Sequence, residues 1–308
     1  MIRNYLKLSV LVALGLWMVS CSKGIDDNKD QQMIVENDNA IKKYIADSSF
    51  SAQKDSSGLY YSLSPNPTGA KLTLGDEVKV RYNAYLLNGT KIWTSEKDTS
   101  KTIKYPFFTG YQFVVPGVEL ALRLMRTGEK VKIFAPFYLG FYGNFQNPLT
   151  GYLTSASIPD YSAIRIDLEL VSKSSEVEQI NSYISQNKLT VFNRTSDNLV
   201  IVKTASVATG DTLGSDKSVK IKYTGKLLDG TVFDPGTTPL TFITGTGRNT
   251  LISGFDRGIR KLKTGEKAIL IIPSPLGYSK SGRVNSTGTN FSIRPYQPIV
   301  FDVEVLSN

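Results

Sequence analysis

Hydrophobic and polar residues alternate along two similar stretches of the chain, which read VKVRYNAYLLNGT (78–90) and VKIKYTGKLLDGT (219–231). An apolar residue at every second position predicts a half-buried β-strand in each stretch. Two further blocks recur in the same order: RTGEKVKIFAP (126–136) returns as KTGEKAILIIP (263–273), and SIPDYSAIRIDLEL (157–170) as SIRPYQPIVFDVEV (292–305). The offsets are 141, 137 and 135 residues. A large and drifting offset indicates two copies of one fold with different loop lengths, because a short-period solenoid repeats every 20 to 50 residues or so.

Helical periodicity occurs twice in each copy. Short amphipathic helices are predicted over 40–47 and 178–187, and each is followed by a predicted strand, over 59–65 and 198–206. One further helix per copy is predicted to follow Pro116-Gly117 or Ser253-Gly254, because the apolar residues after them recur at helical spacing.

Gly128 and Gly265 follow these last helices and are expected to end them as C-cap residues. Strands that surround one helix favour an α+β fold class, in which each copy is a β-rich unit with one central helix lying on a sheet.

Composition limits the chemistry. The chain has 308 residues, 41% of them hydrophobic and 20% charged, which suits two globular domains and neither a disordered chain nor a membrane bundle. It contains no histidine, which argues against Ser-His-Asp hydrolysis, Cys-His proteolysis and nearly every usual zinc or copper site. We therefore expect no metal and no cofactor, and chemistry that depends on Asp, Glu, Tyr, Lys, Arg or shape.

The N-terminus carries one strongly apolar run, LSVLVALGLWMVSC, after a short basic start. A run this short with a positive flank is typical of a secretory signal and not of a spanning helix. Met18-Val19-Ser20 followed by Cys21, the only cysteine, resembles the lipobox of bacterial lipoproteins, with Met18 as a departure from the usual residue. We expect cleavage before Cys21, lipidation of Cys21 and attachment to a membrane through the acyl chains; an ordinary signal peptide with an unmodified thiol is the alternative.

These features predict four segments along the chain: a signal peptide (1–20), a polar tether (21–32), a first domain (33–173) and a second domain (174–308). The net charge of +9 is spread over strand and helix positions and is not concentrated in a run. A solvated surface is the simpler interpretation, and nucleic acid is not an expected partner of an exported lipoprotein.

The second copy resembles the FKBP-type peptidyl-prolyl cis-trans isomerases from about residue 210 to 306. The blocks that carry the resemblance are VKIKYTGKLLDGTVFD, PLTFITGTGRNTLISGFDRGIRKLKTGEKAILIIP, LGYS and IVFDVEVL, in this order. The resemblance implies two FKBP-like domains in tandem, each a twisted antiparallel β-sheet wrapped around one short α-helix.

The resemblance also implies an activity that needs no histidine. Rotation about an Xaa-Pro bond requires neither base nor nucleophile, and an apolar pocket with a few polar groups can favour the twisted amide. By position, the implied catalytic residues are Tyr223, Asp234, Phe255 and Tyr278. Phe255 would form the pocket floor, Tyr278 would donate its hydroxyl to a substrate carbonyl, and Asp234 would lie near the rotating amide. The implied substrate-binding residues are Phe233, Phe242, Leu251, Ile252 and Phe301.

Each of these residues also has a simpler interpretation. The phenylalanines could be core residues, Tyr223 could merely pack, and Asp234 could be a turn residue that bonds its own backbone, which is compatible with the site role. Tyr278 depends on a long polar loop, LGYSKSGRVNSTGTN.

The first copy differs at the same positions. Alignment of Tyr82 with Tyr223 places Ile92 opposite Phe233, Trp93 opposite Asp234, Val118 opposite Phe255, Phe141 or Tyr142 opposite Tyr278, and Ile166 opposite Phe301. This copy is either a scaffold that has lost the site or a binding module for extended or proline-containing chains.

Two functional hypotheses follow. The first is a lipid-anchored prolyl isomerase of the cell envelope, periplasmic or surface-exposed, that helps exported proteins fold and whose second domain is active. Its partners would be proline-containing unfolded or extended polypeptides and, through the anchor, the outer membrane. The second hypothesis is a non-catalytic FKBP-like binding or scaffold lipoprotein. The retention of Asp234 and Tyr278 favours the enzyme, and the sequence leaves the oligomeric state open.

Overall fold

The computed structural model describes residues 27–95, 103–107, 115–141, 158–245, 251–285 and 291–307. Cys21 and Tyr142 lie outside the described residues, as does most of the aromatic loop between Phe141 and Ile158. The helices are α1 (Asp27–Asp47), α2 (Pro116–Leu124), α3 (Glu176–Gln186) and α4 (Ser253–Ile259), and two 3₁₀ turns are η1 (Phe137–Leu139) and η2 (Ser274–Leu276).

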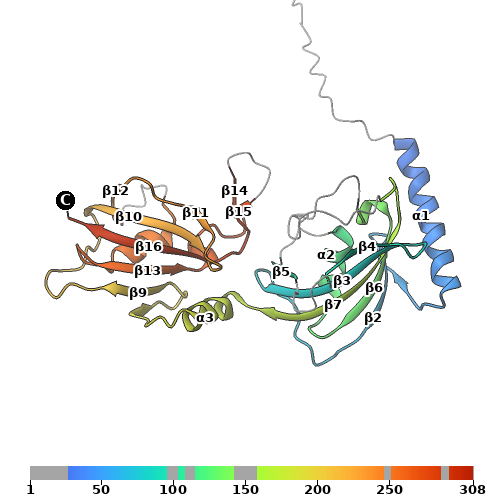
Figure 1. The fold of residues 1–308 in the computed structure, drawn as a ribbon, viewed down its shortest axis with the longest axis horizontal. Helices are drawn as coiled ribbons and strands as arrows, with labels where there is room; N and C mark the ends of the chain where they lie inside the picture. The colour runs from blue at the N-terminus through green and yellow to red at the C-terminus, as the bar shows by residue number, and fades with distance from the viewer. Residues whose placement is uncertain are drawn as a thin grey trace, which may run out of the picture.

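Two seven-stranded sheets share one topology. The first contains β1 (Gln53–Lys54), β2 (Tyr60–Ser64), β3 (Glu77–Leu86), β4 (Lys91–Thr94), β5 (Ile103–Pro106), β6 (Lys130–Ala135) and β7 (Ile164–Ser174). The second contains β8 (Asn193–Arg194), β9 (Val200–Ala205), β10 (Ser218–Leu227), β11 (Val232–Asp234), β12 (Leu240–Ile243), β13 (Lys267–Ile272) and β16 (Ile299–Leu306). We call the part from α1 to β7 the first domain and the part from α3 to β16 the second domain (Figure 1).

The strand order shows that the two sheets are copies. It runs β1-β2-β6-β7-β3-β4 in the first sheet and β8-β9-β13-β16-β10-β11 in the second, and β5 or β12 pairs with the other half of β3 or β10. All these pairs are antiparallel. A small hairpin of β14 (Arg283–Val284) and β15 (Phe291–Ile293) is added in the second domain. The predicted α+β fold class, with two similar sheets, is confirmed.

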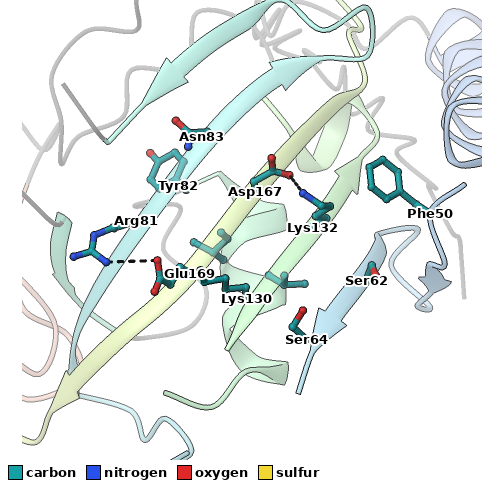
Figure 2. A pocket seen from close by; sticks show the side chains of 12 residues that line it. Phe50, Ser62, Ser64, Arg81, Tyr82, Asn83, Lys130, Lys132, Asp167 and Glu169 are labelled. Carbon is teal, nitrogen blue, oxygen red and sulfur yellow. Dashed lines mark ion pairs between the residues drawn. The ribbon is translucent and has the colours of Figure 1, made fainter. Parts of the chain in front are cut away.

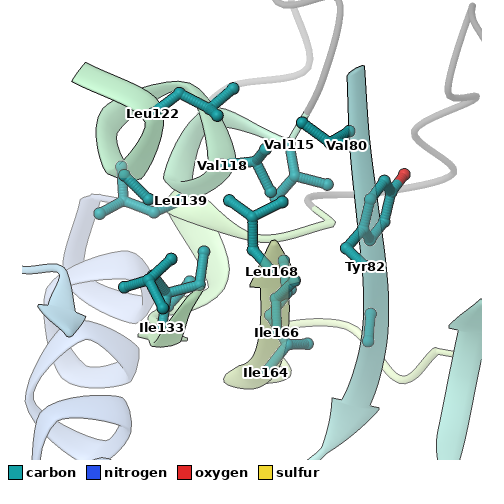
Figure 3. Packing of buried hydrophobic residues seen from close by; sticks show 14 of the residues in the cluster. Val80, Tyr82, Val115, Val118, Leu122, Ile133, Leu139, Ile164, Ile166 and Leu168 are labelled. Atoms are coloured by element: carbon teal, nitrogen blue, oxygen red, sulfur yellow. The ribbon is translucent and has the colours of Figure 1, made fainter. Parts of the chain in front are cut away.

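One helix packs on the inner face of each sheet. In the first domain, Val118 and Leu122 of α2 meet Ile133, Ile166 and other side chains from β3, β6 and β7, and all of them are buried (Figure 3). In the second domain Phe255 and Ile259 of α4 have the same place against Leu270 and Phe301. Burial of this apolar surface is the main favourable term for each domain.

A second helix packs on the outer face of each sheet and precedes the strands of that sheet in sequence. Ile41 of α1 is fully buried against Tyr60 and Phe134, and Ile180 of α3 is fully buried against strands β9, β13 and β16. Ser175 caps α3 in a reciprocal capping box with Glu178, which fixes where that helix starts. In Figure 1, α3 lies between the two sheets.

The helix predicted over 40–47 is much longer in the structure. It begins at Asp27, so the part of the predicted tether from residue 27 onward is helical. Only its C-terminal half packs tightly on the sheet, and the polar residues 27–32 show no hydrophobic periodicity, which explains why the start of the helix was not predicted. Among the described residues, no helix has the length and apolar character needed to cross a membrane.

The prediction that Gly128 and Gly265 are helix C-caps is wrong. Helix α2 is capped by Met125 and α4 by Arg260, several residues earlier. Both glycines have positive φ, +83° and +85°, in the tight turn that enters β6 or β13. The next residue closes that turn: the Glu129 carboxylate accepts the backbone N–H of Arg126, and that of Glu266 accepts the N–H of Lys263. The repeated TGEK therefore marks this turn and not the end of a helix.

Candidate active site

The predicted site residues of the second domain come from neighbouring strands and the start of α4. Gly225 of β10 is the register partner of both Asp234 on β11 and Phe301 on β16, and Tyr223 lies two residues earlier on the same strand. Residues two apart on a strand face the same side, so the Tyr223 side chain lies on the side of the sheet toward which a side chain at position 225 would point. Phe255 is the third residue after Ile252, the N-cap of α4, and is buried against this face.

Phe255 is the centre of an aromatic cluster. Its ring centroid lies 4.9 Å from that of Phe301, 5.9 Å from that of Tyr223 and 6.2 Å from that of Phe242. Phe233 meets Phe301 edge to face, with centroids 5.6 Å apart and an angle of 89° between the rings. Tilted and edge-to-face arrangements suit aromatic pairs, and such contacts fix the ring orientations. The structure therefore brings the predicted phenylalanines together.

Asp234 is both a turn residue that bonds the backbone and a carboxylate beside the aromatic cluster, the two roles that the sequence allowed. One carboxylate oxygen accepts a hydrogen bond from the Tyr223 hydroxyl at 3.3 Å, and the other accepts the backbone N–H of Gly236 at 3.2 Å. Burial raises the pKa of the Tyr223 hydroxyl, and the nearby Asp234 carboxylate raises it further. The hydroxyl thus stays protonated at neutral pH, and the carboxylate is held at the edge of the aromatic cluster.

Leu251, Ile252 and Tyr278 are partly buried and pack against the same core. Tyr278 directly follows Gly277, the C-cap of η2, and is close enough to Tyr223 to contribute to the raised pKa of the Tyr223 hydroxyl, after burial and Asp234. Every predicted site residue of the second domain therefore lies in or beside one cluster. Their individual roles stay predictions.

Two residues near the cluster were missed by the sequence reasoning. Arg283 of β14 opposes the rise in the Tyr223 pKa, which places a positive charge near the site. Gly225 matters because it has no side chain: a Cβ there would lie 2.7 Å from two ring atoms of Phe233 and 2.9 Å from the ring of Phe301. A glycine within an alternating strand indicates such a close approach, so the sequence alone could have marked Gly225 as a position of close packing.

The first domain has the same backbone positions but different side chains. Ala84 of β3 pairs with Trp93 and with Ile166, as Gly225 pairs with Asp234 and with Phe301. Val118 is the third residue after the N-cap of α2, and Phe141 follows the C-cap of η1 as Tyr278 follows that of η2. These registers confirm the residue-by-residue alignment and place Phe141 opposite Tyr278.

Trp93 fills the corresponding space in the first domain. Its ring stacks on Tyr82 with centroids 3.8 Å apart and an angle of 17° between the planes. Trp93 is 6% exposed and Tyr82 is 2% exposed, whereas Tyr223 is only partly buried. The indole ring belongs to the same buried core as the aliphatic residues Val118 and Ile166, which stand where the second domain has phenylalanines.

A cavity of about 340 Å³ lies elsewhere in the first domain, on the outer face of its sheet. Figure 2 shows Arg81 beside Glu169 and Lys132 beside Asp167, at 3.5 and 3.3 Å, with Phe50 at the edge. A similar cavity of about 300 Å³ occurs at the matching strand positions of the second domain, where Lys267 pairs with Glu304 at 3.4 Å. Its presence in both copies indicates a property of the fold, separate from the site on the inner face.

The sequence profile of one protein family, described as FKBP-type peptidyl-prolyl cis-trans isomerase, matches residues 69–171 and 210–306, which together are more than half of the chain. The chain belongs to the FKBP-type peptidyl-prolyl cis-trans isomerase family. Both domains match, although only the second retains the aromatic cluster and the Tyr223–Asp234 pair.

Similar proteins with this family description occur in different organisms. The human peptidyl-prolyl cis-trans isomerase FKBP9 is 29% identical over 238 residues, which cover 76% of this chain and 35% of the relative. A probable FKBP-type isomerase of Haemophilus influenzae is 34% identical over 116 residues, which cover 37% of this chain and 44% of the relative. The chain thus spans about a third of the length of FKBP9. A crystal structure of three FKBP domains of wheat FKBP73 is 24% identical, covers 83% of this chain and 98% of that one, and has a TM-score of 0.37.

The geometry at Gly225 yields a stability prediction. Gly225→Ala should lower the free energy of unfolding of the second domain by about 1–3 kcal/mol, because its Cβ would force the rings of Phe233 and Phe301 to move. Thr224→Ala on the same strand is the control, with an expected change within about 0.5 kcal/mol. Denaturant unfolding of both variants, followed by the NMR signals of second-domain backbone amides, measures the difference. Equal stability of the two variants would show that the rings do not depend on Gly225.

Proposed function

We propose that the second domain catalyses cis-trans isomerisation of Xaa-Pro peptide bonds in extended or unfolded polypeptides. The observation that supports it most directly is the cluster of aromatic rings around Phe255 beside the Tyr223–Asp234 hydrogen bond. The described part of the first domain has aliphatic residues and Trp93 in this place. One fold with two different sets of side chains suggests that the second set is retained for a task.

The chemistry of the reaction suits this cluster. Rotation about the peptide bond is opposed by a barrier of about 18–20 kcal/mol, which arises from amide resonance. In the planar amide, charge is separated and stabilised by water, so that rings which exclude water favour the less polar twisted amide. The apolar faces around Phe255 would hold the proline ring while the preceding carbonyl turns. This proposal requires only that the twisted amide is bound better than the planar one.

Asp234 and Tyr278 supply the polar part of the proposal. The Asp234 carboxylate is fixed by two hydrogen bonds and lies at the edge of the cluster, so it would interact with the dipole of the rotating amide without moving. The Tyr278 hydroxyl would donate to a carbonyl of the bound chain. Neither group needs to gain or lose a proton, which agrees with a chain that has no histidine.

We infer that the first domain does not catalyse this reaction. Trp93 occupies the position of the carboxylate and stacks on Tyr82, which leaves both rings buried. The first domain would instead assist the second, by capturing clients or by structural support. The alternative, in which both domains are non-catalytic scaffolds, has the same fold but gives the Tyr223–Asp234 pair no task.

The proposed activity can be tested in the full-length chain with conservative changes. Asp234→Asn keeps the size and the turn but removes the charge, and we expect it to lower kcat/KM about tenfold, or about 1.4 kcal/mol of transition-state stabilisation. Phe255→Leu should cause a similar loss because it removes the central ring. The measurement is isomerisation of a short proline-containing peptide, by a protease-coupled assay or by NMR exchange.

Trp93→Phe in the first domain is the matched control, and its kcat/KM should equal that of the parent chain. A parent chain without activity, or an Asp234→Asn variant with full activity, would contradict the assignment of catalysis to this cluster.

We also propose that the protein is a bacterial lipoprotein of the cell envelope, anchored to the outer membrane through Cys21, where it would assist the folding of exported proteins. The basis is the apolar run that ends at Cys21 in a lipobox-like sequence. Two acyl chains on one residue give stable membrane attachment, whereas a single short chain does not.

The anchor has a direct test. Bacterial cells that express the chain and grow with a labelled fatty acid should incorporate the label into the protein, and Cys21→Ala should abolish incorporation. Label in the Cys21→Ala variant, or its absence from the parent chain, would contradict the lipoprotein assignment.

A further inference from the structure

The turn that carries Tyr278 is held by a set of backbone hydrogen bonds. The Ser279 N–H donates to the Ser274 carbonyl at 2.8 Å, and the Gly282 N–H donates to the carbonyl of Tyr278 at 3.0 Å. Ser279 has a φ of +51°, in the left-handed region that serine rarely adopts. Such a backbone persists only where its surroundings hold it, so the contacts around this turn decide where Tyr278 lies.

The first outside contact comes from the helix that joins the two domains. Glu176 is the first residue of α3 and follows directly after β7 and the Ser175 cap. Its carboxylate accepts the backbone N–H of Ser274, which is the first residue of η2 and 3% exposed. Burial raises the pKa of Glu176, and hydrogen bonds from the backbone and side chain of Ser274 oppose this rise. A carboxylate from the interdomain helix is thus built into the start of the Tyr278 turn.

The second contact joins Tyr296 of the second domain to Gly75 of the first domain. The Tyr296 N–H donates to the Ser279 carbonyl at 2.8 Å, and Tyr296 itself has a φ of +58°. On its other side is Gly75 of the first domain: a Cβ at Gly75 would lie 3.1 Å from the Cβ of Tyr296. Gln179 of α3 supports this contact, since its side-chain amide donates to the carbonyls of Ser174 at 3.0 Å and Gly75 at 3.4 Å.

Charge also links the two domains at this place. Arg294, two residues before Tyr296, is half-buried, and burial lowers its pKa. The carboxylates of Asp229 in the second domain and Glu77 in the first oppose this shift. Acidic groups from both domains therefore lie close to one half-buried guanidinium beside the Tyr296 turn.

In the first domain, the 3₁₀ turn is held in the same way, but only by residues of the first domain itself. Asn37 of α1 accepts the N–H of Phe137, the first residue of η1, at 2.9 Å and donates to the carbonyl of Tyr161 at 3.0 Å. Tyr161 aligns with Tyr296 and also has a positive φ, of +60°. In each domain, the helix ahead of the sheet thus holds the N–H at the start of the 3₁₀ turn. The second domain differs because Gly75, in the other domain, completes the support.

We propose that Glu176 and Tyr296 are positioning residues through which α3 and the first domain hold the Tyr278 turn in the geometry that the site of the second domain requires. This role rests on the proposed isomerase activity of the second domain. In this role the first domain needs no binding pocket. It contributes the surface at Gly75 against which Tyr296 packs, and it holds the start of α3 in place.

The decisive comparison is between Glu176→Ala and Glu176→Gln in the full-length chain. Alanine removes the acceptor for the Ser274 N–H, whereas the glutamine amide oxygen can still accept that bond. We expect Glu176→Ala to lower kcat/KM for a proline-containing peptide about three- to tenfold and to speed hydrogen exchange in the segment 273–279. Glu176→Gln should restore most of both properties. Ser185→Ala, at an exposed position later on the same helix, is the control and should leave both properties unchanged.

A second variant tests the contact with the first domain. Tyr296→Asn keeps the backbone N–H and tolerates positive φ, but it removes the ring beside Gly75. It should also lower kcat/KM and speed exchange in the segment 273–279.

Three results would overturn this role. Equal activity of Glu176→Ala and Glu176→Gln would show that the acceptor does not matter, and faster exchange with unchanged kcat/KM would show that catalysis does not depend on the held turn. Unchanged hydrogen exchange in Tyr296→Asn would show that the contact with the first domain does not hold the Tyr278 turn. An inactive parent chain would instead refute the proposed function itself, and the exchange data would still show whether Glu176 holds the turn.

Discussion

The register of the central strand β10 is the constraint on which the rest of the second domain depends. By pairing Gly225 with Asp234 on one side and with Phe301 on the other, it brings strands β10, β11 and β16 to one point on the inner face of the sheet. Because side chains alternate on a strand, a slip of one residue would turn Tyr223 away from Phe255 and break the hydrogen bond to Asp234. The absence of a side chain at Gly225 then lets the phenylalanine rings lie directly on the strand.

The first domain shows that the same register permits a different interior. Four positions that are aromatic or acidic in the second domain are Ile92, Trp93, Val118 and Ile166 in the first, and all four are buried. One of the four side chains is larger than its counterpart and the other three are smaller aliphatic groups, and all belong to one buried core. Close packing of this kind stabilises the fold and leaves less room for a ligand. In the described residues, the two seven-stranded sheets thus share one topology and differ in the side chains that fill the space on their inner faces.

The sequence predicted the fold class because the signals were local or repeated. Alternating strands, the helix after each Pro-Gly or Ser-Gly pair and the three repeated blocks all lie within short windows, and the alignment of the copies placed Trp93 and Val118 correctly. The start of α1 was missed because the residues before Asn37 pack on little, and Gly128 was misassigned because its turn is closed by the Glu129 side chain. Glu176 was not found as a site residue because its contact with Ser274 joins positions 98 apart in the chain.

In the proposed function, the second domain binds proline-containing chains at its aromatic cluster, whereas the first domain has its own tryptophan at the corresponding position. The most direct measurement is a titration of the isotope-labelled full-length protein with a proline-containing peptide, observed by NMR. The chain has two tryptophans, and Trp17 lies in the apolar N-terminal run, so the indole resonance of Trp93 reports on the first domain. We expect the resonances of backbone amides around Tyr223, Asp234 and Phe255 to shift, and the indole resonance of Trp93 to stay unchanged. A Trp93 shift at lower peptide concentration than those amides would contradict the proposed function.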